Sequence, residues 1–159
     1  MLFRSFSFTL RLLLTEPPKE QKPEESENTA VELKGKRILT VEDNELNMEI
    51  ISAVLEDYGI LVDPAENGKI ALDKIAVSPV GYYDMILMDI MMPVMDGLEA
   101  TREIRKLNRP DARTIPSVAM TANAFEEEQK KSIASGMNEH LTKPLSMEKL
   151  EKTLRKYLS

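Results

Sequence analysis

The sequence predicts an α/β fold in which a parallel sheet of five strands carries helices on both faces, a doubly wound arrangement. Two observations lead to this prediction. From about residue 36 onward, a short apolar run alternates with an amphipathic segment five times. Each expected strand is followed by a helix before the next strand begins, and such crossovers pair the strands in parallel and place helices on both sides of the sheet.

The first two strand and helix pairs occupy residues 37–76. Residues 37–41 (RILTV) form an apolar run typical of a buried strand, and apolar residues then recur at helical spacing from Ile50 until Gly59 ends the helix. Residues 60–67 (ILVDPAEN) and 69–76 give a second, less regular pair. We therefore expect the fold to begin with two complete crossover units.

The other three pairs follow the same order. The expected elements are strand 85–89 with helix 98–107, strand 114–122 with helix 124–136, and strand 139–143 with a last helix that Ser146 caps. Gly136 is placed to end the fourth helix, since glycine readily adopts the left-handed backbone conformation found there. The sequence thus predicts five helices beside the five strands.

Composition narrows the classes of protein that the chain can represent. The 159 residues are 42% hydrophobic and 30% charged, values typical of one globular domain with a tail. The net charge of −6 gives no support to nucleic acid or an anionic membrane as a partner, and we expect neither contact. The absence of cysteine excludes disulfides and thiolate sites and is compatible with a reducing cytoplasm, where we expect this segment.

The chain divides into three expected parts. Residues 15–35 are rich in Pro, Glu and Lys and are predicted to be a flexible linker, whereas residues 36–159 form the globular part. Residues 1–14 (MLFRSFSFTLRLLL) alternate in the manner of a half-buried strand. Arg11 interrupts their apolar part and no small-residue cleavage site follows, so a secretory signal fits poorly, and a targeting presequence is the remaining alternative.

Charged or hydroxyl side chains stand at the carboxyl ends of four of the expected strands. Glu42 and Asp43 follow the first strand, Asp89 ends the third, Thr121 lies at the end of the fourth and Lys143 at the end of the fifth. In doubly wound sheets these ends meet at one edge, which is where ligands bind. Three neighbouring carboxylates repel one another, and oxygen ligands of this kind favour Mg²⁺ as the cation that relieves the repulsion.

This set of side chains is suited to phosphoryl transfer. A carboxylate such as Asp89 beside Mg²⁺ can attack a phosphoryl group and form an aspartyl phosphate. Lys143 and Thr121 would contact the phosphoryl oxygens, and so would the backbone N–H groups of Ile90 and Ala122. Any one of these residues alone is more often a helix cap or a solvated strand end, so the prediction depends on their combination and order.

Four stretches of the sequence resemble one known family. "TVEDNELNMEI", "YDMILMDIMMPVMDG", "VAMTANAF" and "GMNEHLTKPL" are similar to the receiver domain of two-component response regulators, and the resemblance covers residues 36–159. It implies a flavodoxin-like fold with strand order 2-1-3-4-5. It also implies phosphorelay signalling, in which a histidine kinase or a histidine phosphotransfer domain donates a phosphoryl group from a phosphohistidine.

The resemblance also assigns roles to residues. It makes Asp89 the phosphoacceptor, and Thr121, Lys143 and the backbone of Ile90 and Ala122 the contacts of the phosphoryl group. It places Mg²⁺, or Mn²⁺ in its place, on the following ligands: the carboxylates of Glu42, Asp43 and Asp89 and the backbone carbonyl of Met91. It further implies a cis peptide bond between Lys143 and Pro144.

One position departs from the commonest family pattern. Three residues before the lysine, where the family often has Tyr or Phe, this chain has its only histidine, His140. His140 is therefore the switch candidate, and the coupling between phosphorylation and the outer face of the domain is less defined than the chemistry. Met91 and Asn123, which flank the acceptor and Thr121, are expected to tune the lifetime of the phosphoryl group.

The first residues indicate a larger parent protein. "FRSFSFTLRLLL" resembles the closing strand of a histidine-kinase ATPase domain, and a linker followed by a receiver is the arrangement of hybrid histidine kinases. In that context this segment is a phosphoacceptor with self-catalysed phosphotransfer and slow autodephosphorylation, and the parent kinase can be anchored in a membrane.

Other functions fit the sequence less well. A stand-alone response regulator needs the same site and differs only in its context, and a receiver that acts only as a docking module would not need the intact acidic set. A phosphohydrolase that forms an aspartyl phosphate usually has a second Asp two residues after the nucleophile, where this chain has Met91. A nucleotide-binding domain would need a glycine-rich loop after the first strand, and none is present.

Overall fold

The protein folds around one parallel sheet. The computed structural model describes residues 32–123 and 125–159, so the expectations for the strand at 1–14 and most of the linker lie outside the described residues. The sheet has the order β2-β1-β3-β4-β5, as the sequence analysis predicted. Its strands are β1 Arg37–Val41, β2 Leu61–Ala65, β3 Met85–Asp89, β4 Ser117–Thr121 and β5 Glu139–Thr142.

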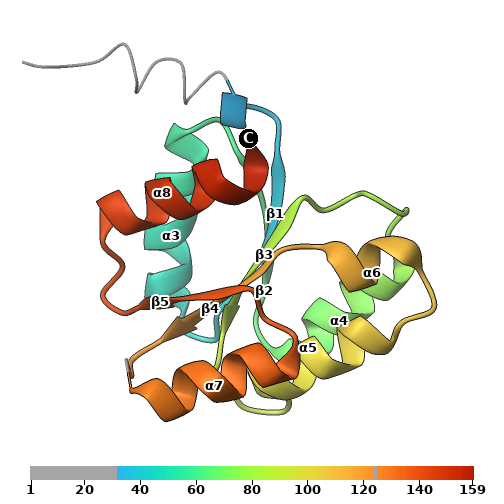
Figure 1. Cartoon of the computed structure of the whole chain (residues 1–159). Helices are drawn as coiled ribbons and strands as arrows, with labels where there is room; N and C mark the ends of the chain where they lie inside the picture. Colours follow the sequence, from blue (N-terminus) through green and yellow to red (C-terminus); the bar gives the residue numbers. More distant parts are fainter. Residues whose placement is uncertain (1–31, 124) are drawn as a thin grey trace, which may run out of the picture.

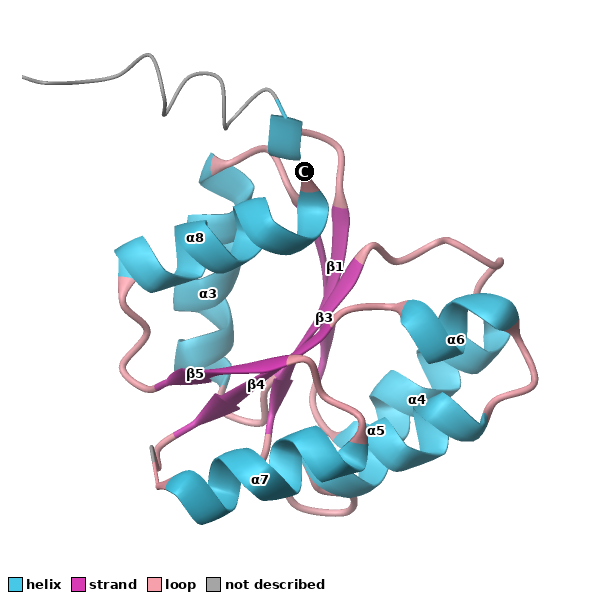
Figure 2. Cartoon of the chain, viewed as in Figure 1, coloured by secondary structure: helices cyan, strands magenta, loops and turns pink. Residues whose placement is uncertain are grey.

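Helices cover both faces of the sheet (Figure 1). The helices are α3 Glu45–Asp57, α4 Gly68–Val77, α5 Gly97–Lys106, α6 Pro110–Thr114, α7 Glu126–Ser135 and α8 Met147–Leu158. Helices α3 and α8 lie on one face, while α4, α5, α6 and α7 lie on the other (Figure 2). None of the described helices is long and apolar enough to cross a membrane.

Alternation along the strands supplies two hydrophobic cores. In β1, Leu39 belongs to the core under α4 and α5, and Ile38 belongs to the core under α3 and α8. All residues of the central strand β3 are buried because helices cover it from both sides. This is why β3 is apolar from Met85 to Met88, and why the carboxylate that ends it at Asp89 requires a partner.

The described residues contain six helices, one more than predicted. The additional helix, α6, has only five residues, too few to show a helical period in the sequence. Pro110 begins it, and the guanidinium of the preceding Arg109 pairs with Asp111 at 2.7 Å and donates to the backbone carbonyl of Ser78 at 2.9 Å. Helix α6 is therefore fastened to the end of α4.

Candidate functional site

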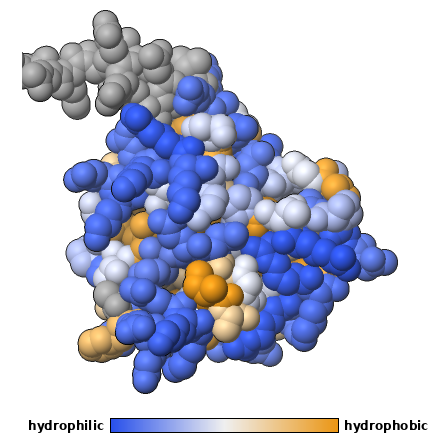
Figure 3. Space-filling view, viewed as in Figure 1, coloured by the Kyte–Doolittle hydropathy of each residue, from blue (hydrophilic) through white to orange (hydrophobic). Residues whose placement is uncertain are grey.

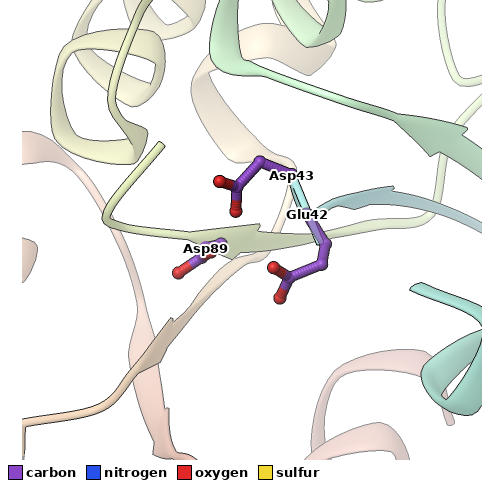
Figure 4. Close-up of side chains that lie close together, drawn as sticks. All are labelled: Glu42, Asp43 and Asp89. Atoms are coloured by element: carbon purple, nitrogen blue, oxygen red, sulfur yellow. The ribbon is translucent and has the colours of Figure 1, made fainter. Parts of the chain in front are cut away.

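Three carboxylates gather at the carboxyl edge of the sheet. Glu42 and Asp43 follow β1, Asp89 ends β3, and one oxygen of each lies within 4.8 Å of the others. Figure 4 shows the three side chains close together, with Asp89 on β3 and with Glu42 and Asp43 next to each other after β1. Glu42 and Asp89 are buried, with 2% and 6% of their surface exposed, whereas Asp43 is exposed to solvent. A cation that approaches from solvent therefore meets Asp43 first.

A cleft of about 240 Å³ joins these carboxylates to the other strand ends. Its lining contains most of the predicted site: Glu42, Asp43, Asp89, Ile90, Met91, Thr121, Ala122 and Lys143. Asn44 and Asn47 also line it and were missed by the sequence analysis. The Asn44 side chain accepts a hydrogen bond from the Asn47 backbone N–H at 3.0 Å and caps α3, and an asparagine directly before a helical pattern is the signal that could have identified it.

Lys143 reaches over the acidic cluster from β5. Its ammonium Nζ lies 2.6 Å from Glu42 Oε2 and 3.3 Å from Asp89 Oδ2. Burial works to lower the pKa of this ammonium, but the hydrogen bond to Glu42 and the charges of Asp89 and Glu42 outweigh it and raise the pKa above its usual value. The following bond, Lys143–Pro144, is cis, as the resemblance implied.

Ionisation of Asp89 is unfavourable in the metal-free protein. Burial, and then the negative charge of Glu42, raise the pKa of Asp89 to about 6 although the Lys143 ammonium opposes them. An added divalent cation would remove much of this cost, because it supplies the positive charge that the cluster lacks. The electrostatics of the cluster are thus those of a cation site.

This raised pKa predicts how stability depends on pH. The folded state holds the Asp89 proton up to about pH 6, whereas the unfolded chain releases it near pH 4, so the stability that the protonated carboxyl provides is lost as pH rises through that interval. A shift of about two pKa units corresponds to roughly 3 kcal/mol as an upper value. We expect metal-free Asp89→Asn to unfold at nearly the wild-type urea concentration at pH 4 and to be more stable by up to that amount at pH 7.5.

The comparison with Asp89→Asn cancels the titration of the other carboxyls, since both proteins share them. Lys143 keeps Glu42 as its partner in the variant. An equal difference in unfolding free energy at the two pH values would show that Asp89 titrates normally in the folded protein.

The hydroxyl and backbone groups predicted to contact a phosphoryl group differ in whether they already have a hydrogen-bond partner. Thr121 Oγ1 accepts from the Asn123 N–H at 3.1 Å and donates to the Asn123 carbonyl at 3.2 Å, so its hydroxyl must give up the second contact to donate to a phosphoryl oxygen. The Ile90 N–H donates to the Met120 carbonyl at 3.2 Å, which corrects its assignment as a phosphoryl contact: the hydrogen-bond ladder between β3 and β4 continues for one residue after Asp89. Within the described part of the chain, the N–H groups of Met91 and Ala122 have no hydrogen-bond partner.

The loop after Asp89 is fixed at its far end. Gly97 begins α5 and its N–H donates to the Ile90 carbonyl at 2.9 Å, while the Asp96 side chain accepts from the Glu99 N–H at 2.8 Å and caps the helix. Between these points Met91 is 81% exposed at the rim of the cleft. The Met91 side chain therefore lies where water or a phosphodonor would enter the cleft.

His140 lies on β5 outside the cleft. It is partly exposed and pairs in register with Ala119 of β4, on the side of the sheet that α7 covers. The outer surface of α7 carries an apolar patch within a mostly hydrophilic face (Figure 3), and Ile133 of this helix is 55% exposed. His140 thus lies on the side of the sheet that α7 covers, and its role as a switch residue stays a prediction.

Comparison with known proteins identifies relatives over most of the described chain. A family model for the response regulator receiver domain matches residues 38–155. The hybrid signal transduction histidine kinase L of Dictyostelium discoideum is 39% identical over 137 residues, which cover 84% of this chain and 8% of that protein. The sensor histidine kinase GacS of Pseudomonas protegens is 36% identical over 146 residues, covering 91% of this chain and 15% of that protein. The chain therefore spans a small part of the length of these relatives.

Solved structures of receiver domains are also similar to this chain. The receiver domain of the sensor histidine kinase PA1611 from Pseudomonas aeruginosa, which has a magnesium ion coordinated in its active site cleft, matches with a TM-score of 0.70 and 37% identity over 78% of this chain and 98% of that one. The receiver domain of Ssk1 from Saccharomyces cerevisiae, crystallised with the histidine phosphotransfer protein Ypd1, matches with a TM-score of 0.70 and 29% identity over 79% of this chain and 90% of that one.

Proposed function

Because the chain belongs to the response regulator receiver domain family, we propose that it accepts a phosphoryl group from a phosphohistidine onto Asp89 and thereby switches its contacts with other proteins. The observation that carries this proposal is the position of Asp89, buried at the end of β3 with the carboxylates of Glu42 and Asp43 close by and the Lys143 ammonium 3.3 Å away. Asp89 therefore lies among charged side chains and also lines an open cleft.

The proposed reaction is a transfer between two side chains. A carboxylate oxygen of Asp89 attacks phosphorus, the bond between phosphorus and the donor imidazole breaks, and that imidazole leaves with the electron pair and takes up a proton. Lys143 neutralises charge on the transferring group, as does Thr121 through a hydrogen bond once its hydroxyl gives up the Asn123 carbonyl. We propose as backbone donors the N–H groups of Met91 and Ala122, which line the cleft and have no hydrogen-bond partner among the residues that the structure describes.

The carboxylates fit a divalent cation, and Mg²⁺ is the one we propose, with Mn²⁺ as a substitute. Glu42, Asp43 and Asp89 all line the cleft and are the carboxylates that would hold the ion, and the backbone carbonyl of Met91, which also lines the cleft, is the fourth proposed ligand. When bound, the ion supplies positive charge that lets the carboxylates approach one another and offsets the charge of the phosphoryl oxygens.

A chemical test separates an aspartyl phosphate from other products. The protein is incubated with Mg²⁺ and acetyl phosphate, and its intact mass is measured before and after neutral hydroxylamine, which cleaves acyl phosphates and spares phosphate esters of serine and threonine. We expect a gain of one phosphoryl group that hydroxylamine removes. A gain that resists hydroxylamine would place the phosphoryl group on a hydroxyl and refute the proposal.

An apolar groove beside the cleft suits a helical histidine-bearing partner. The groove has a volume of about 470 Å³ and lies between α3 and the segment that follows β5. It is lined by Asn47, Ile50, Ile51, Val54, Lys143, Pro144, Leu145, Met147 and Leu150. Lys143 and Asn47 line both the groove and the cleft, so a partner seated in the groove would bring its histidine to Asp89. We propose a histidine phosphotransfer domain or the histidine-bearing helices of a kinase as this partner.

If a protein donor docks in the groove, a substitution there should slow transfer from that protein but not from a small-molecule donor. Ile50 is 56% exposed on α3, and Ile50→Glu would place a charge in the apolar contact. We expect transfer from a phosphorylated histidine phosphotransfer protein to slow by about tenfold or more, which is about 1.4 kcal/mol. Phosphorylation by acetyl phosphate should change far less, because that donor is too small to touch the groove.

Val77→Glu is the matched control for this experiment. Val77 is 85% exposed at the end of α4, on the other side of the sheet from the groove. We expect it to leave transfer from both donors at the wild-type rate. Equal slowing by Ile50→Glu and Val77→Glu would show that the groove is not part of the docking surface.

The larger context is also a proposal. The relatives named hybrid or sensor histidine kinases are several times longer than this chain. Within that context residues 1–14 would close an upstream ATPase domain and residues 15–35 would link it to the receiver at 36–159. The enzyme activity would then reside in the kinase, while this segment supplies the phosphoacceptor.

A further inference from the structure

The methionines of the described chain differ widely in their exposure to solvent. The sequence has ten methionines, and all but Met1 lie among the described residues. Most of these are buried or half-buried: Met48, Met85, Met88, Met92, Met95, Met120 and Met137. Two are exposed, Met91 by 81% and Met147 by 51%. Each of these two lines a cavity, Met91 the cleft at Asp89 and Met147 the apolar groove beside it.

Met91 adds nothing to the hydrophobic cores, unlike its neighbours in the same loop. Met92 and Met95 pack against the core under α4 and α5, whereas Met91 belongs to neither core. The hydrogen bond from the Gly97 N–H to the Ile90 carbonyl, at 2.9 Å, closes the loop behind it. The Met91 thioether is therefore at the surface in the folded protein and needs no local unfolding to meet a solute.

Exposure decides which thioether a hydroperoxide oxidises to a sulfoxide. With hydrogen peroxide, a lone pair of sulfur attacks one peroxide oxygen, the O–O bond breaks, and the other oxygen leaves as water after a proton transfer. Sulfur gives up two electrons and the peroxide accepts them. Because the peroxide must touch the sulfur, a buried thioether reacts only after local opening. Met91 can react from the folded state.

A sulfoxide at position 91 would change the entrance of the cleft. Oxidation turns an apolar side chain into a polar one with a strong hydrogen-bond acceptor. The N–H groups of Met91 and Ala122 line the cleft without a partner among the described residues, so the sulfoxide oxygen competes with phosphoryl oxygens for them. The partial negative charge on that oxygen also opposes the approach of an anionic phosphodonor. Both effects lower the rate of phosphorylation.

We propose that Met91 is an oxidation site through which hydroperoxides slow the acceptance of a phosphoryl group by Asp89. The inference deepens the proposed function and rests on it for the effect on phosphorylation, whereas the position of the oxidation is independent of it. Met147 provides an internal comparison, because its thioether is also exposed but lines the groove and not the cleft.

The first measurement locates the oxidation. The protein is treated with hydrogen peroxide, samples are digested at intervals, and fragmentation of the peptides in a mass spectrometer assigns each sulfoxide to its methionine. We expect Met91 to be oxidised faster than the buried Met85 and Met120 by at least about tenfold, which corresponds to about 1.4 kcal/mol of protection by burial. Oxidation of Met91 as slow as that of Met120 would overturn the inference.

The second measurement is the rate of phosphorylation by acetyl phosphate and Mg²⁺ after the peroxide has been removed. Wild type, Met91→Leu and Met147→Leu are each compared with the same protein before oxidation, so any effect of the substitution itself cancels. We expect the wild type and Met147→Leu to slow by about tenfold, less than the about hundredfold scale for complete loss of one donor, and Met91→Leu to keep its rate. Methionine sulfoxide reductases A and B with dithiothreitol should restore the wild type.

The outcomes separate this inference from the proposed function. Equal slowing of Met91→Leu and the wild type, or an unchanged rate in wild type whose Met91 is fully oxidised, would overturn the inference and leave the proposed function intact. A wild-type protein that gains no phosphoryl group even before oxidation would count against the proposed function, while the peptide analysis still decides whether Met91 is the oxidation site.

Discussion

Lys143→Met is expected to destabilise the metal-free protein and to slow its phosphorylation at the same time. The substitution keeps an apolar stem of similar length but removes the one ammonium that contacts both Glu42 and Asp89. Removal of one partner from a buried ion pair typically costs about 3–5 kcal/mol because the other charge is left unpaired, and Glu42 is almost fully buried. We expect a loss of about 3 kcal/mol in urea unfolding at pH 7.5.

Magnesium should reverse part of this loss. A divalent cation supplies positive charge to the same carboxylates, and a ligand that binds only the folded state raises the free energy of unfolding. Saturating Mg²⁺ should therefore stabilise Lys143→Met more than the wild type. The rate of phosphorylation by acetyl phosphate should still fall by about a hundredfold, the scale for loss of one group that stabilises transferring charge.

Lys69→Met provides the control for the loss of a lysine. Lys69 pairs with Asp73 on the outer surface of α4, where both side chains are more than half exposed, and such pairs contribute little to stability. We expect this variant to unfold and to become phosphorylated as the wild type does. If Lys143→Met matched Lys69→Met in stability, Lys143 would have no part in neutralising the buried cluster.

Gly97→Ala is expected to have the largest effect on the loop that carries the acceptor. A Cβ at this position would lie 2.2 Å from the Asp89 backbone carbonyl oxygen and 2.9 Å from Met88 Cγ. The close approach arises because Gly97 begins α5 directly beneath the end of β3. Since the nearest atom belongs to the backbone, either β3 or α5 must move, and overpacking of this kind costs about 1–3 kcal/mol or more.

The displacement should also reach the site, because the Asp89 carbonyl and its side chain move together. We expect Gly97→Ala to lose about 3 kcal/mol in urea unfolding and to bind Mg²⁺ more weakly. Gly81→Ala is the graded control: no atom lies within 4 Å of its added Cβ, but its φ of +77° lies in the left-handed region, which costs about 1–2 kcal/mol for a residue with a side chain. An equal loss for the two variants, with unchanged Mg²⁺ affinity in both, would contradict this account of Gly97.

Much of the fold was predictable because buried parallel strands have a simple signature. The run from Met85 to Met88 is apolar throughout since helices cover both faces of β3. Cap residues such as Asn67 and Ser146 mark helix starts at short range. Helix α6 was not predictable in this way, because five residues fastened by Arg109 depend on a contact with α4 that is distant in the sequence.

The site was predictable as a set of residues but not in its pairing. A parallel sheet brings its strand ends together, so Asp89, Thr121 and Lys143 could be placed at one edge from the sequence alone. Which carboxylate Lys143 prefers is decided by the separation of β1 and β5 and by the length of Glu42, and neither is visible in a linear pattern. The same holds for the Ile90 N–H, whose use depends on how far the ladder with β4 continues.

The most direct test of the account is whether Asp89 itself carries the phosphoryl group. Wild-type protein and Asp89→Asn are each mixed with Mg²⁺ and beryllofluoride, which mimics an aspartyl phosphate, and examined by fluorine-19 NMR, with intact mass after acetyl phosphate measured beside it. We expect signals of bound beryllofluoride and a gain of one phosphoryl group in the wild type, and neither in Asp89→Asn. No adduct in the wild type although Mg²⁺ binds, or an equal adduct in both proteins, would contradict the central claim.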